Sequence, residues 1–132
     1  MLDKSLTDLQ EIEYYVVVEH RNHMIITSPR PVPVIGNRLS YDFSQSESYI
    51  SLLGHGQKEL ADGTYAMFIG NIEHDDLGIN DINFSDVKMF LGSNGKHSSY
   101  FSADVDFDGD VNVKDQEKIL ANLGVFTEVP QK

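Results

Sequence analysis

The pattern of apolar and polar residues divides the chain into two parts with different expected structure. In residues 14–69, apolar residues occur in short runs rich in β-branched and aromatic side chains, which is typical of strands. The expected strands are residues 14–18, 23–27, 39–43 and 64–69. From residue 70 onward, apolar residues recur at helical spacing. We therefore expect an α+β chain, with a small antiparallel β-sheet or sandwich module at 1–69 followed by a module of loop–helix units at 70–132.

Turn and breaker residues indicate how the strands of the first part connect. Residues 61–63 read Ala-Asp-Gly, a turn signal just before the last expected strand. The two histidines within 20–23 would lie on opposite faces of a strand, so a hairpin turn is favoured there over a metal or nuclease site. Three prolines within 28–37 lack amide donors, which predicts an edge strand or a polyproline-like crossover.

Two segments of the second part have the spacing of amphipathic helices. The first segment, 84–91, has apolar residues at spacings i, i+3 and i+7, and the second segment covers 116–123. The residues expected on the core faces are Phe84, Val87 and Leu91 in the first helix, and Ile119, Leu120 and Leu123 in the second. Gly92 and Gly124 stand where helices of this length would end.

These two helices belong to an internal repeat. Residues 82–86 align with 111–115 at an offset of 29, and 70–75 align with 103–108 at an offset of 33. The difference of four corresponds to an insertion around 77–81 in the first copy. The second part is thus a duplicated loop–helix unit with one regular and one extended copy.

The regular copy contains a complete calcium-loop pattern at 104–115. Oxygen-bearing residues occupy loop positions 1, 3, 5, 7, 9 and 12, and Gly109 occupies position 6. Ca²⁺ takes six to eight oxygen ligands, and a chain wrapped around one ion presents alternate residues to it. A metal-free acidic loop is the alternative, but the helix that follows and the copy upstream favour calcium. The predicted ligands are Asp104, Asp106, Asp108, Asp110 through its carbonyl, Asn112 directly or through water, and Asp115.

The extended copy matches the same pattern less well. Its oxygen-bearing residues stand at positions 1, 3 and 5, but Asp76 replaces the glycine, and positions 9 and 12 match only after the insertion. We expect a second calcium site here if the inserted residues bulge outward, and a vestigial loop stabilised by hydrogen bonds otherwise. The candidate ligands are Asn71, Glu73, Asp75, Asn83 and Asp86.

The composition narrows the classes of function. The net charge of −11 would repel phosphate backbones, so nucleic acid is not an expected partner, whereas bound cations would neutralise part of this charge. The chain has no cysteine, which excludes disulfides and thiolate chemistry, and it has no apolar run long enough for membrane insertion. It also lacks a nucleophile elbow and a glycine-rich phosphate loop. We therefore expect no catalytic residues and a protein that is not an enzyme.

Over roughly residues 70–124, the duplicated loop–helix unit resembles a dockerin-type repeat pair. The resemblance implies two calcium sites, a helical module with pseudo-twofold symmetry and a cohesin-like protein partner. Loop positions 10 and 11 usually hold a small hydroxyl pair in type I dockerins, and this chain departs from that pattern. The partner-binding residues implied at these positions are Phe84, Ser85, Val113 and Lys114.

The first part resembles a segment that precedes dockerin-like repeats in large secreted proteins of the Bacteroidetes type. This resemblance implies an extracellular or cell-surface location, with the chain forming the C-terminal part of a larger protein. The expected function is calcium-dependent protein docking or structural stabilisation of that protein. The alternative is a carbohydrate-binding or adhesin module that uses the aromatic strands of the β part.

Overall fold

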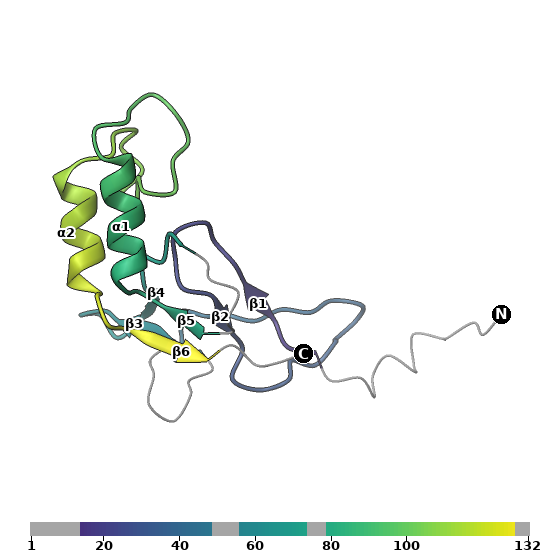
Figure 1. Ribbon diagram of the computed structural model, residues 1–132. Coiled ribbons are helices and arrows are strands. Elements are labelled where there is room, and N and C mark those ends of the chain that lie inside the picture. The colour runs from purple at the N-terminus through teal and green to yellow at the C-terminus, as the bar shows by residue number, and fades with distance from the viewer. Residues whose placement is uncertain (1–13, 49–55, 74–78, 129–132) are drawn as a thin grey trace.

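The computed structural model describes residues 14–48, 56–73 and 79–128, and it is mixed α+β within them. The strands and helices are β1 (Val17–Val18), β2 (Ile26–Thr27), β3 (Gln57–Glu59), β4 (Tyr65–Met67), β5 (Ile79–Asp81), α1 (Phe84–Ser93), α2 (Val113–Ala121) and β6 (Phe126–Glu128). The strands form three antiparallel pairs, β1–β2, β3–β4 and β5–β6. The two helices lie side by side, and the β5–β6 pair lies at one end of them (Figure 1). The described residues of the first part thus form two hairpins, connected by a backbone bridge between His23 and Ile69, instead of a sandwich.

Both predicted turns of the first part are confirmed. Residues 20–23 connect β1 to β2, and the amide of His23 donates to the carbonyl of His20 at 3.4 Å. Residues 61–63 connect β3 to β4, where Gly63 has a φ of +80° and donates its amide to Leu60 O. Glycine adopts such a positive φ without a steric penalty, which explains its place in this turn.

The strand expected at 39–43 is wrong. Asp42 Oδ1 accepts hydrogen bonds from both the amide and the hydroxyl of Ser44, at 2.9 and 2.6 Å. This local bonding gives the backbone an alternative to a strand ladder. The prolines of 28–37 form no described strand, and this segment crosses beside the first hairpin, where Val32 donates its amide to Tyr14 O at 2.7 Å.

Each helix begins at an asparagine that caps it. Asn83 Oδ1 accepts from the Ser85 amide at 2.6 Å, and Asn112 Oδ1 accepts from the Lys114 amide at 2.9 Å. Such caps satisfy amides that have no partner within the helix. α2 consequently begins three residues before the expected 116. The prediction that Gly92 ends the first helix is wrong, because α1 continues to Ser93.

The predicted core faces of the helices are only partly right. Phe84 and Leu91 point to solvent, with 77% and 60% of their surfaces exposed, and Leu120 is 45% exposed. Ile119 is buried as predicted, and the other residues that the helices bury are Asp86 and Phe90 in α1 and Asp115 in α2. In both helices, a buried aspartate lies four residues before a buried apolar side chain.

One hydrophobic cluster contains residues from both parts of the chain. Its members are Met24, Phe68, Ile72, Ile82, Phe90, Ala103, Val105, Val111 and Ile119. The chain passes between the parts at Gly70, where φ is +120° and an added Cβ would lie 3.2 Å from the Cα of Ile119. The core therefore spans residue 70, and the division into domains at 69/70 stays a prediction.

Backbone hydrogen bonds join the insertion of the first repeat copy to the segment that follows α2. β5 pairs with β6 in the register Ile79↔Glu128 to Asp81↔Phe126. Next to these strands, the Ile82 amide donates to Val125 O at 2.9 Å, and the Gly124 amide donates to Ile82 O at 2.8 Å. Within the described residues, neither helix has the length and apolar character needed to cross a membrane.

Candidate metal centre

Three aspartates of the regular loop come together as the sequence predicts. Asp104, Asp106 and Asp108 each offer a carboxylate oxygen, and these oxygens all lie within 4.8 Å of one another. The loop reverses direction at Gly109, whose φ is +94°. The predicted glycine at position 6 therefore has the backbone conformation that the turn requires.

Asp104 is the most deeply buried member of this group, with 5% of its surface exposed. Its amide donates to Phe101 O at 3.2 Å, and its Oδ2 accepts from the Gly109 amide at 3.1 Å. Its other carboxylate oxygen, Oδ1, is buried without a hydrogen-bond partner. A buried carboxylate oxygen without a partner costs free energy, so this atom fits a site that a cation completes.

The other two carboxylates order the loop from within. Asp106 Oδ1 accepts from the Asp108 amide at 3.2 Å, and Asp108 Oδ1 accepts from the Asp110 amide at 3.0 Å. Asp108 Oδ2 also forms an ion pair with Lys114 Nζ at 3.2 Å. The Asp110 amide and then Lys114 lower the pKa of Asp108, so this carboxyl is ionised at neutral pH. The lysine is largely exposed, and such a pair competes weakly with a divalent cation.

Position 12 is occupied by a carboxylate that holds the loop against α2. Asp115 is fully buried, its Oδ1 accepts from the amides of Val105 and Asp106 at 2.8 and 3.2 Å, and its Oδ2 accepts from the Asn112 amide at 2.9 Å. Its role as a calcium ligand stays a prediction. At position 7, the Asp110 carbonyl receives only a long contact of 3.5 Å from Asn112 Nδ2.

Asp86 makes the equivalent three bonds in the first copy. Its Oδ1 accepts from the amides of Ile72 and Glu73 at 2.7 and 2.9 Å, and its Oδ2 accepts from the Asn83 amide at 2.8 Å. The repeat offsets align these three partners with Val105, Asp106 and Asn112, whose amides donate to Asp115. The hydrogen bonds therefore confirm the alignment of the two copies. Burial raises the pKa of Asp86, and the three amides counteract part of this rise.

The metal site predicted in the extended loop stays a prediction. Asn71 is buried and Glu73 is exposed, while Asp75 lies outside the described residues. Asn83 caps α1 with its Oδ1 and donates from Nδ2 to Asp81 Oδ1 at 2.9 Å. Among the residues that the structure describes, the only group of three metal-type side chains is the one in the regular loop.

Comparison with known proteins adds no family to this geometry. No protein-family model matches the chain, and no curated protein or solved structure matches it either. The assignment of a function therefore rests on the residues themselves.

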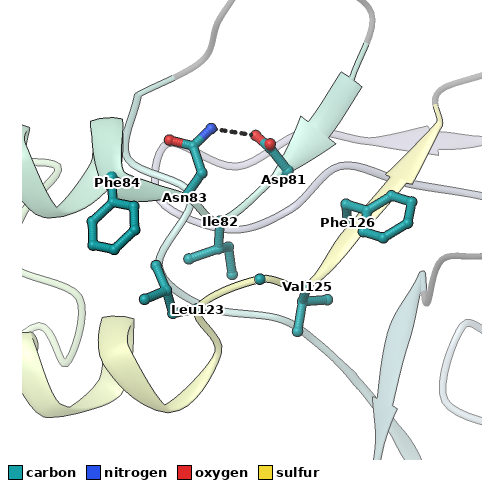
Figure 2. A pocket seen from close by; sticks show the side chains of 8 residues that line it. Asp81, Ile82, Asn83, Phe84, Leu123, Val125 and Phe126 are labelled. Carbon is teal, nitrogen blue, oxygen red and sulfur yellow. Dashed lines mark hydrogen bonds between the residues drawn. The ribbon is translucent and has the colours of Figure 1, made fainter.

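The four residues predicted to bind a partner are all accessible. Phe84 and Val113 begin the two helices, with 77% and 62% of their surfaces exposed, and each is followed by an exposed polar residue, Ser85 and Lys114. Phe84 also borders an apolar groove between the start of α1 and the segment that follows α2 (Figure 2). The other side chains that the figure labels around this groove are Asp81, Ile82, Asn83, Leu123, Val125 and Phe126.

The sequence did not indicate that the turn at 20–23 contacts the loop at 104–115. The side chain of Asn22 donates to the backbone of the loop, and the ring of Phe107 stacks on His23 with centroids 6.3 Å apart. Phe107 has a φ of +62°, a conformation that is uncommon for aromatic residues. Contacts between residues this distant in sequence leave no periodic pattern. The only local signal was Phe107, an aromatic residue at a non-ligand position of the loop.

Proposed function

We propose that the chain is a calcium-binding module and that its loop at 104–115 holds one Ca²⁺. The observation that carries this proposal is Asp104 Oδ1, a buried carboxylate oxygen without a partner in a group of three converging aspartates. Unpaired buried charges are unfavourable, and several carboxylate oxygens that converge on one point bind a hard divalent cation best.

The residues present fit such an ion. Asp104, Asp106 and Asp108 supply side-chain oxygens, the Asp110 carbonyl lies at position 7, and Asp115 lies at position 12. Bound calcium supplies positive charge that offsets the repulsion among these carboxylates. The chain itself holds the loop against α2 through the hydrogen bonds that three backbone amides donate to the Asp115 carboxylate.

Calorimetric titration of Ca²⁺ into EDTA-stripped protein, beside a melting curve, tests this proposal. We expect binding at one site with a Kd of roughly 10⁻⁴–10⁻³ M or lower, the range of extracellular modules. At a hundredfold excess over Kd, the melting temperature should rise on the order of 5–10 °C. A second binding event would support the site predicted in the extended loop. No heat of binding at millimolar calcium would refute the proposal.

A docking role is the second part of the proposal, and it rests on the exposed residues that begin the helices. Phe84 and Val113 are large apolar side chains at equivalent positions of the two copies, and both face solvent. Exposed apolar surface of this kind is often a protein-binding site. We propose a dockerin-like module that presents this surface to a cohesin-like protein domain, as the C-terminal part of a larger secreted protein and without catalytic activity of its own.

Calcium-dependent capture tests the docking role. We expect the immobilised chain to retain a cohesin-type domain in calcium and to release it in EGTA, because metal loss loosens the loops that position the helices. Phe84→Ser should weaken retention, whereas Lys58→Ser, a change at an exposed residue of β3, should not. Retention that EGTA does not affect would contradict calcium-dependent docking.

A further inference from the structure

The side chain of Asn22, in the turn between β1 and β2, reaches the backbone of the calcium loop. Asn22 Nδ2 donates to the backbone carbonyl of Asp104 at 3.1 Å, a buried contact between residues separated by 82 positions. Asp104 is also the residue whose Oδ1 is buried without a partner. The β part of the chain therefore holds the backbone of the most buried of the three converging aspartates.

Asn22 is itself fixed in place. The residue is completely buried, and its own carbonyl accepts from the Gly70 amide at 2.8 Å. Its Oδ1 lies 2.8 Å from His23 Nδ1. Burial, and then the nearby His20, lower the pKa of His23 to about 4, so its imidazole is neutral at pH 7. The tautomer that carries its proton on Nδ1 can donate to this oxygen or to His20 Nδ1, which also lies 2.8 Å away. The orientation that points Nδ2 at Asp104 is therefore held by the surrounding bonds.

The bonds to Asp104 leave only one of its oxygens for a ligand. The amide of the residue donates to Phe101 O, its carbonyl accepts from Asn22, and its Oδ2 accepts from the Gly109 amide. Ring packing fixes the same loop nearby, because Phe107 contacts both histidines of the turn, with centroids 5.8 and 6.3 Å apart. A ligand held in place before the ion arrives does not have to be ordered when it binds.

We propose that Asn22 is a positioning residue for the calcium site, so that the hairpin of β1 and β2 completes a loop formed 82 residues later. This inference rests on the proposed calcium binding. Because coupling between two sites is reciprocal, calcium also stabilises the contact between the hairpin and the loop.

Asn122 provides a matched control for a test of this role. Its Nδ2 also donates to a distant backbone carbonyl, Ile69 O at 2.8 Å, and its surface is 8% exposed. We expect Asn22→Ala to raise the calorimetric Kd for Ca²⁺ about tenfold, and Asn122→Ala to change it less than twofold. Both variants should lose thermal stability in EDTA, since each loses one buried hydrogen bond.

The outcomes separate this inference from the calcium site itself. Equal Kd values for Asn22→Ala and the unaltered chain would overturn the positioning role and leave the calcium site intact. An equal rise in Kd in Asn22→Ala and Asn122→Ala would also overturn it, because the weaker binding would then come from a general loss of stability. No binding by the unaltered chain would overturn both proposals.

A measurement on the unaltered chain does not depend on the folding of a variant. In NMR spectra, the side-chain amide resonances of Asn22 should move when Ca²⁺ is added, while those of Asn122 should stay in place. An unmoved Asn22 signal during saturable calcium binding would contradict the coupling.

Discussion

Asp104→Asn is expected to weaken calcium binding about 100-fold or more. The substitution keeps the size of the side chain but removes the charge of the most buried of the three converging aspartates. Calcium affinity in such loops depends strongly on the number of charged ligands, and a buried charge is screened little by solvent. Calorimetry at pH 7.5 would measure the effect as a rise in Kd.

Thermal stability distinguishes the loss of a ligand from damage to the fold. In EDTA, Asp104→Asn should melt at or above the temperature of the unaltered chain, because it removes a buried charge that has an unpartnered oxygen. In millimolar calcium, the variant should show no increase in melting temperature. Asp62→Asn removes the same charge from the exposed turn at 61–63 and should bind calcium normally. An unchanged Kd in Asp104→Asn would place the ion elsewhere.

Asp115→Ala is expected to lower the free energy of unfolding by about 3 kcal/mol or more, even without calcium. Three backbone amides donate to this buried carboxylate, and alanine would leave them without their acceptor. Each buried donor left unsatisfied costs about 1–3 kcal/mol, and part of this cost is recovered where water enters. Asp86→Ala should show a similar loss, because Asp86 makes the equivalent bonds in the first copy.

Urea unfolding in EDTA would measure both losses. Asp110→Ala is the matched control, since Asp110 is an exposed aspartate of the same loop and its change should alter stability by less than about 0.5 kcal/mol. If Asp115→Ala matched Asp110→Ala, the three amide bonds would contribute little to the stability of the fold.

The features predicted well from the sequence depend on short spacings. The convergence of the aspartates at 104–108, the repeat and the turns at 20–23 and 61–63 are specified by residues a few positions apart. β3 was not predicted because its sequence, Gln-Lys-Glu, is polar, and its strand conformation comes from pairing with β4. The contact of Asn22 with Asp104 was not predictable either, because it joins positions 82 residues apart.

The helix faces were misjudged for a more specific reason. Apolar spacing alone placed Phe84 in the core, but the rotation of α1 is set by Asp86, whose side chain must reach the amides of Ile72 and Glu73. Once Asp86 points inward, the residue one turn later, Phe90, is buried with it. A polar residue therefore determined which apolar residues are buried.

The register of β5 and β6 has a consequence for a chain under tension. Ile79 and Glu128 are paired, so a pulling force that enters at residue 79 and leaves at residue 128 acts on the same end of the ladder. Hydrogen bonds in this geometry open one after another, beginning with that pair, instead of sharing the load. Pulled in this way, the strand pair would open at low force, and resistance to tension would come from the hydrophobic cluster shared by both parts of the chain.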